Sequence, residues 1–199
     1  MRSLYALLLC GGLALSVVAS PAAAQCVSGT VTVSLSNDAG FVGLYKYCVS
    51  ATWSLGSHDM SHLDTFLGLP DCPCICNPAF IRFQTPAGTA SPLDDSCIIN
   101  VFGAYVCKGD PSLPPAMNGP AVKFQPDTSS VCDPYLVGHG TFCFYSPMPP
   151  QASQTYTNAL AIKHGPDICY GDLVGSLPSC DCALPAEGLT WGRLKSTYR

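Results

Sequence analysis

Charged side chains are scarce in this chain. Lys, Arg, Asp and Glu together make up 11% of its 199 residues, against about 25% in ordinary soluble domains. Glu187 is the only glutamate, so nearly all the acidic residues are aspartates, which favour turns where glutamates favour helices. The formal net charge is −4, with no basic stripe and no interleaving of basic and aromatic residues. The composition therefore speaks against a helical protein and against nucleic acid as a partner.

Long apolar runs are also missing, apart from one near the first residue. Arg2 precedes the almost wholly apolar stretch 4–18, and the small residues of ASPAAAQ follow it. This stretch is short for a membrane span, so we expect a secretory signal peptide over residues 1–24, cleaved after Ala24. A lipoprotein signal centred on Cys10 is disfavoured, because little apolar sequence precedes that cysteine. We expect export to the periplasm, the cell surface or the medium, and no membrane span.

Cysteine, in contrast, is abundant. The chain has thirteen cysteines, and loss of Cys10 with the signal leaves twelve, in a remaining chain long enough for one domain with a core. An even number in an exported chain predicts up to six disulfides, but the sequence does not give their pairing. The candidates are Cys26, Cys48, Cys72, Cys74, Cys76, Cys97, Cys107, Cys132, Cys143, Cys169, Cys180 and Cys182.

Alternation of apolar and polar residues predicts β-strands. In YKYCVSATWSL (45–55), Tyr45, Tyr47, Val49 and Trp53 share one face, and polar residues occupy the other. We expect Trp53 to be buried against side chains of later strands. The expected partners are Phe142 and Phe144, or Leu160 and Ile162. Further strands are predicted at 29–36, 62–69, 79–84, 97–102, 120–125, 140–146 and 158–163.

Segments rich in Gly, Pro and Asp separate these runs, for example 85–95 and 109–120. Many short strands joined by such turns are typical of an antiparallel sandwich or barrel. We expect an all-β, disulfide-stapled antiparallel β-sandwich, jelly-roll-like or immunoglobulin-like, over residues 25–184. The basic tail 185–199 ends in TWGRLKSTYR, whose apolar residues at helical spacing predict a short C-terminal helix. This tail either docks on the domain or acts as a sorting segment.

Two histidines raise the question of a metal site. His58 and His62 have the spacing of the zinc-protease motif H-E-x-x-H, with Asp59 in place of the glutamate. That motif requires a helix, whereas the surrounding sequence indicates a turn and a strand. On an extended chain the two residues would lie about 13 Å apart, too far to share one zinc ion. We expect neither to bind a metal, and we retain His58 and His62 as the alternative.

The cysteine run CPCIC (72–76) has a simpler interpretation. On a strand its three thiols would lie on one side, about 6.5 Å apart. That spacing is tighter than the pairs of a zinc knuckle, and an oxidising compartment favours disulfides over thiolate ligands. The pair Cys180 and Cys182 is interpreted in the same way.

No motif for catalysis is present. G-x-S-x-G is missing, and His139 in GHGTF suits either an oxyanion loop or, more simply, a tight turn. Asp94 and Asp95 are typical of a turn rather than of a glycosidase pair. The Asp-rich segment 164–172 offers oxygen ligands for calcium, but it lacks EF-hand spacing. We expect no catalytic residue and no cofactor.

Several phrases resemble secreted bacterial domains of unknown function. They are GLYKYCVSATWSLGSHDMSHLDTFL (43–67), PAVKFQPD (120–127), GTFCFYSPMPPQ (140–151), NALAIKHG (158–165) and LVGSLPSC (173–180). The resemblance spans about residues 29–180. It places Ser61 and His62 at a Ser-His position and Lys163 at the lysine of the final strand. It implies a β-sandwich of a surface or exported protein, and it brings no catalytic residues. The cysteine content exceeds the pattern.

These observations predict a non-enzymatic, exported β-sandwich module with a structural, adhesive or interaction role. Its partner would be an extracellular protein or glycan. The alternatives are a secreted metal-binding domain for zinc or calcium, and a secreted hydrolase. The hydrolase would need a concave pocket lined by His139, His62 or aspartates.

Overall fold

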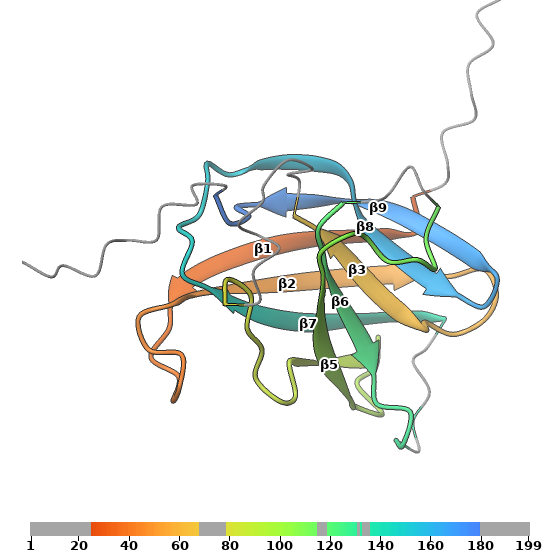
Figure 1. Cartoon of the computed structure of the whole chain (residues 1–199). Coiled ribbons are helices and arrows are strands. Elements are labelled where there is room, and N and C mark those ends of the chain that lie inside the picture. Colours follow the sequence, from red (N-terminus) through yellow and green to blue (C-terminus); the bar gives the residue numbers. More distant parts are fainter. Residues whose placement is uncertain (1–24, 68–78, 115–118, 131, 133–135, 180–199) are drawn as a thin grey trace, which may run out of the picture.

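The computed structural model describes residues 25–67, 79–114, 119–130, 132 and 136–179. The regular elements of these residues are all β-strands, with no helix among them (Figure 1). The strands are β1 (Val27–Leu35), β2 (Tyr45–Ser54), β3 (His62–Phe66), β4 (Gly88–Pro92), β5 (Ile99–Val106), β6 (Ala121–Pro126), β7 (Val137–Ser146), β8 (Gln154–His164) and β9 (Asp167–Gly175). The expected signal peptide and C-terminal helix lie outside the described residues, as do Cys72, Cys74, Cys76, Cys180 and Cys182.

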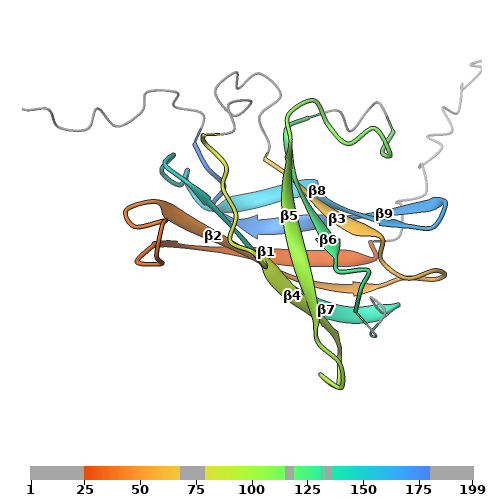
Figure 2. The same ribbon diagram turned by 60° about the horizontal axis from the view of Figure 1, so that its bottom comes forward.

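The strands form one closed barrel, so the predicted sandwich is wrong. They pair in the order β1-β2-β7-β4-β5-β6-β3-β8-β9, always antiparallel. A parallel pair between β9 and β1, with Gly29 opposite Leu173, closes the ring. Figures 1 and 2 show β5 and β6 running steeply across β1, β2 and β7. Alternation did not separate the two folds, because a sandwich and a barrel each bury one face of every strand.

Most of the predicted strands are confirmed. Seven of the eight predicted runs coincide with β1, β2, β3, β5, β6, β7 and β8. The run 79–84 is not a strand and makes only an isolated bridge between Arg82 and Tyr145. Two strands were missed: β4 lies in the predicted turn 85–95, and β9 lies in the Asp-rich segment 164–172 and beyond it. Both strands contain Gly, Pro or Asp and therefore have a low β-propensity. Their pairing with long neighbouring strands outweighs this low propensity.

Side chains fill the interior of the barrel. Tyr47, Phe124, Phe142 and Phe144 are all fully buried, as is Leu160. The rings of Phe124 and Phe142 stack at 5.2 Å, and those of Tyr47 and Phe144 at 5.1 Å. The Tyr47 hydroxyl donates a hydrogen bond to the Met148 carbonyl at 2.7 Å, which satisfies its one buried polar group. These rings form a packed aromatic core across the barrel.

The prediction for Trp53 is confirmed. Its side chain is 3% exposed, and its ring stacks on Phe142 at 6.5 Å. Its register partner on β7 is Gly138, where an added Cβ would lie 3.0 Å from the Trp53 ring and 2.6 Å from a backbone oxygen. The glycine therefore makes room for the indole.

Three disulfides join distant parts of the described chain. Cys48 and Cys143 are register partners on β2 and β7, with Cα atoms 4.2 Å apart. Cys26, which precedes β1, is bonded to Cys169 on β9, so this bond crosses the junction at which the ring closes. The third joins Cys97 to Cys132. Cys107 is also disulfide-bonded.

Candidate functional site

Strand β3 is unusual because both of its faces are buried. Its sequence is HLDTF, and only Phe66 is even partly exposed. Leu63 belongs to the barrel core and lies opposite Phe124 and Ile162. Since alternate residues of a strand point to opposite faces, His62 and Asp64 point outward. There they meet the segment 107–114, which follows β5 and supplies Asp110 and Ser112.

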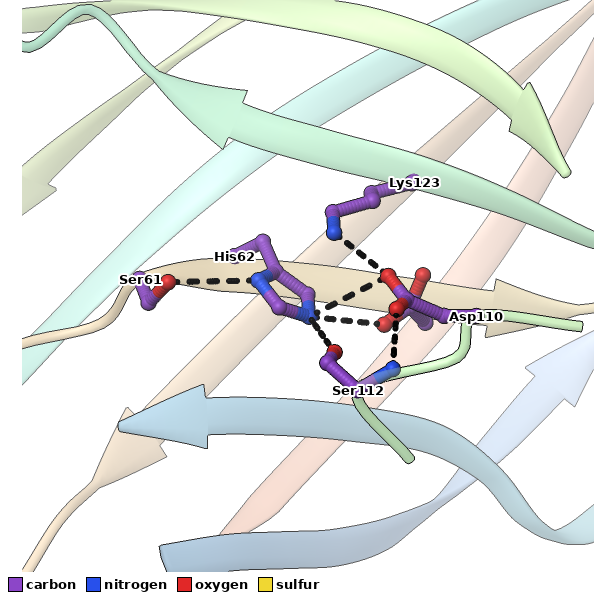
Figure 3. Close-up of polar contacts among 6 residues, drawn as sticks. Ser61, His62, Asp110, Ser112 and Lys123 are labelled. Carbon is purple, nitrogen blue, oxygen red and sulfur yellow. Dashed lines mark hydrogen bonds and ion pairs between the residues drawn. The ribbon is translucent and has the colours of Figure 1, made fainter. Parts of the chain in front are cut away.

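The outward side chains form a buried polar cluster, which we call the His62 cluster (His62, Asp64, Asp110, Ser112 and Lys123) (Figure 3). The His62 Nε2 atom lies 3.3 Å from Asp64 Oδ2, 3.4 Å from Asp110 Oδ2 and 3.2 Å from Ser112 Oγ. On the other side of the ring, Nδ1 lies 3.2 Å from the hydroxyl of Ser61.

Asp110 is well supplied with hydrogen bonds. The Lys123 ammonium group donates to its Oδ2 at 2.5 Å, and the Ser112 backbone N–H donates to its Oδ1 at 2.7 Å. Lys123 comes from β6, where it is the register partner of Asp64. In Figure 3 the lysine reaches across β3 toward Asp110. This ion pair fastens the segment 107–114 to the outer wall of the barrel.

Asp64 is the opposite case. It is 0% exposed, and among the described residues neither of its carboxylate oxygens accepts a hydrogen bond. The His62 ring nitrogen at 3.3 Å is a near neighbour without hydrogen-bond geometry. A buried carboxylate with no donor is costly, because its hydration is lost and not replaced.

The two carboxylates therefore differ in acidity. Burial raises the pKa of Asp64, and the nearby His62 offsets only part of that rise. Burial would also raise the pKa of Asp110, but hydrogen bonds from Lys123 and Ser112 outweigh it and lower the pKa to about 2. Asp110 is therefore the stronger acid of the two, and ionisation of Asp64 carries an electrostatic cost.

The cluster does not build a serine-hydrolase triad on Ser112. In a triad the serine and the acid occupy opposite nitrogens of the imidazole, whereas Ser112 and both carboxylates here surround Nε2. Ser61 does face the other nitrogen. It is exposed just before β3, however, and neither of the two grooves described below includes it.

The other histidines lie apart from this cluster. His58 has a left-handed backbone (φ 55°) and packs its ring against Gly165. The group of potential ligands around His62 consists of Asp64 and Asp110 and does not include His58. His139 on β7 lies 3.1 Å from Asp95 in a partly exposed ion pair. The His164 ring lies 2.6 Å from the Ser57 carbonyl.

A second candidate surface is the outer face of β1, β2, β7 and β4. Register partners place two rows of polar side chains across these four strands: Ser28, Thr52, His139 and Ser91 in one, and Thr30, Ser50, Thr141 and Thr89 in the other. We call this surface the hydroxyl face. The hydroxyls of Ser28 and Thr52 lie 3.2 Å apart, and those of Ser50 and Thr141 lie 3.3 Å apart. A shallow groove of about 460 Å³ runs over the parts of both rows that lie on β1, β2 and β7. On β4, Ser91 is buried and bonds to Asp95. A second groove lies beside it at the starts of β1 and β7.

Sequence reasoning found His62 but missed Asp64, Asp110 and Lys123 as its partners. One signal was available: HLDTF puts an aspartate at the centre of a predicted strand, two residues from the histidine. The other two residues arrive from segments that follow much later in the chain, and only the pairing of β3 with β6 brings Lys123 to this place.

No family model, curated protein or solved structure matches this chain. In the described part of the chain, no helix has the length and apolar character needed to cross a membrane.

Proposed function

We propose that this chain is an exported, non-enzymatic β-barrel module that binds a neutral extracellular glycan on its hydroxyl face. The observation that carries the proposal is the double row of Ser, Thr and His side chains over four adjacent strands. Hydroxyl groups both donate and accept hydrogen bonds, so such a surface complements the hydroxyls of a sugar.

The construction of the barrel supports an outer binding surface. Its interior is filled by aromatic and aliphatic side chains, so a ligand has to bind outside. The described sheet is closed, and closure removes the free strand edges that would otherwise pair with a peptide. A partner must therefore meet a face or a loop. Of the residues that line the groove, only His139 can carry a charge, which favours a neutral partner over a charged one.

The disulfides support a role outside the cell. Cys48 and Cys143 lie on the same outward side as the hydroxyl rows, next to Thr32, and tie together two of its strands. A cross-link of this kind restricts the unfolded chain and suits a domain that works in an oxidising compartment. It also holds β2 and β7 in register under the groove.

The test is binding of the oxidised full chain to immobilised neutral polysaccharides. The variant Thr30→Val/Thr141→Val removes one hydroxyl on each side of the groove while keeping the side-chain shape. We expect it to weaken binding at least tenfold. The matched control is Thr128→Val/Thr157→Val, which changes two exposed threonines outside the groove and should bind like the parent chain. Absence of binding to any glycan, or equal loss in both variants, contradicts the proposal. Capture of a protein ligand that the Thr30→Val/Thr141→Val variant still binds would point to another surface.

A further inference from the structure

The buried carboxylate of Asp64 lacks the partner that its position demands. It is fully buried, aims its Oδ2 at the His62 ring nitrogen, and accepts no hydrogen bond within the described residues. Native proteins rarely leave a buried charged group in this state. A group that satisfies it must be cationic or a strong donor, and must fit between Asp64, His62 and Asp110.

Hydrogen bonding alone does not account for the crowding around His62 Nε2. Three oxygens lie 3.2–3.4 Å from this single nitrogen. A protonated Nε2 carries one hydrogen and serves one of them well, and an unprotonated Nε2 donates to none. The Ser112 hydroxyl can itself donate to an unprotonated Nε2, but the two carboxylates only accept, so at least one carboxylate oxygen beside Nε2 receives no hydrogen bond from the histidine.

The same distances fit the edges of a metal coordination polyhedron. With zinc bonds of about 2.0–2.1 Å, two ligands of a tetrahedral site lie about 3.3–3.4 Å apart. The distances from His62 Nε2 to Asp64 Oδ2 and to Asp110 Oδ2 are 3.3 and 3.4 Å. One donor atom from each of the three residues lies within 4.8 Å of the others.

The groups behind these ligands are arranged as in a metal site. Ser61 contacts Nδ1 of His62 and orients the ring so that Nε2 faces the carboxylates. Lys123 and the Ser112 backbone N–H hold the Asp110 carboxylate. The Ser112 N–H bonds Oδ1, whereas Lys123 bonds Oδ2, the oxygen that lies 3.4 Å from His62 Nε2. Hydrogen bonds from surrounding residues orient the ligands of protein metal sites in this way.

The positive charge of Lys123 repels a cation bound at this cluster. The bound ion must therefore be one that its ligands hold strongly. A weakly held oxygen-loving ion such as calcium requires six to eight oxygen ligands, and this cluster offers one imidazole and two carboxylates with an ammonium group beside them. An imidazole nitrogen with two carboxylates suits a divalent transition metal, which binds nitrogen strongly enough to tolerate the lysine.

We propose that His62, Asp64 and Asp110 form a binding site for a divalent transition metal ion of the zinc type. The ion would join β3 to the segment 107–114, and so lock that segment onto the barrel. The site lies on a different part of the barrel from the hydroxyl face, and the proposal does not depend on the glycan-binding function.

The test uses the oxidised full chain, stripped with a chelator and then titrated with Zn²⁺. We expect one zinc per chain by elemental analysis after gel filtration, with no free thiols in the same sample, so that cysteine ligation is excluded. At a hundredfold excess over Kd the melting temperature should rise by about 5–10 °C. Ca²⁺ at the same concentration should not change it. Co²⁺ in place of zinc should give the visible absorption of a tetrahedral ion.

Two ligand variants and one control make the test specific. Asp64→Asn and His62→Gln should each lose the bound zinc and the rise in melting temperature, while circular dichroism shows an intact barrel. The control His139→Gln removes a histidine of a partly exposed ion pair and should bind zinc like the parent. Absence of zinc in the parent chain overturns the proposal, as does zinc that persists in both ligand variants. If a variant fails to fold, the stoichiometry and melting shift of the parent chain still decide.

Discussion

Two walls of the same barrel differ in whether their outward-pointing polar side chains are exposed to solvent or buried. The wall of β1, β2, β7 and β4 turns most of its serines and threonines outward to solvent, and buried and more exposed residues alternate along much of β1 and β2. The wall around β3 turns a histidine and an aspartate outward, and the segment 107–114 covers them. The first wall behaves as binary patterning predicts, and the second does not.

The difference shows that the outer face of a barrel is not always its surface. On the hydroxyl face most side chains are neutral hydroxyls, and neighbouring hydroxyls lie within hydrogen-bond distance of one another. Beneath the segment 107–114 the side chains are charged and must satisfy one another. Removing a polar group should therefore change stability little on the hydroxyl face, and should change it more, in either direction, beneath the segment 107–114.

The largest effect is expected inside the first wall. Trp53→Ala removes a buried indole that stacks on Phe142, and we expect a loss of about 3–5 kcal/mol in the free energy of unfolding. Urea unfolding with the disulfides intact measures it. The matched control is Phe102→Ala on β5, where the ring is 40% exposed and the loss should stay below about 1 kcal/mol. Equal losses would show that the two aromatic rings are equally buried in solution.

The next largest effect is expected at Asp110. Its folded-state pKa of about 2 lies below the ordinary value of about 3.9, a difference worth about 2.6 kcal/mol. Because the folded pKa is lowered, this stabilisation is present above pH 3.9 and disappears as the pH falls toward 2. Asp110→Asn should lose about 2–3 kcal/mol at pH 7 in the presence of a chelator, and most of that difference should vanish near pH 2.

A suitable control is Asp127→Asn, since that carboxylate bonds only within its own turn. It should change the unfolding midpoint far less than Asp110→Asn does. A pH-independent loss for Asp110→Asn would mean that packing, and not the Lys123 pair, is what the substitution disturbs.

A smaller effect of opposite sign is expected at Asp64. Its folded pKa is raised, mainly by burial, so folding becomes less favourable as the pH rises through that pKa. Asp64→Asn removes the buried charge with little change of shape. In a chelator at pH 7 we expect it to raise the free energy of unfolding by about 1 kcal/mol. Saturating zinc should reverse the order and make the parent chain the more stable one. A variant that is less stable in the chelator would show that Asp64 is already paired with a protonated His62.

The smallest effect is expected on the hydroxyl face. Thr30→Val/Thr141→Val changes two exposed hydroxyls, so the free energy of unfolding should stay within about 0.5 kcal/mol of the parent for each site. Thermal melting measures this. A loss of several kcal/mol would indicate that these side chains support the barrel, and any binding defect of the variant would then need another explanation.

Local patterning in the sequence was enough to locate seven strands and the buried face around Trp53. It was not enough for the fold, because the parallel pairing of β1 with β9 decides between barrel and sandwich, and no local pattern encodes it. It also failed for β9, where Asp and Gly in DICYGDLVG mask a strand held by neighbours on both sides.

The candidate metal site shows the same limit. His62 was noticed for its spacing to His58, whereas the potential ligands grouped with it are Asp64, two residues on, and Asp110 from another segment. Asp64 sits on the face that alternation assigns to solvent. That face is buried only because the segment 107–114 covers it. The turn-rich sequence of this segment does not indicate where the segment packs.

The closing pair of the barrel has a consequence for how the chain is made. Cys26 precedes the first strand and is bonded to Cys169, 143 residues later in the sequence. Cys48 is bonded to Cys143, 95 residues later. On the proposed route of export, the earliest thiols emerge long before their partners, while nearer cysteines compete for them. A catalyst that joins thiols in order of appearance would trap wrong pairs and leave the ring open. The native topology therefore requires thiol–disulfide exchange after synthesis, so the yield of folded protein should be limited by disulfide isomerisation rather than by oxidation.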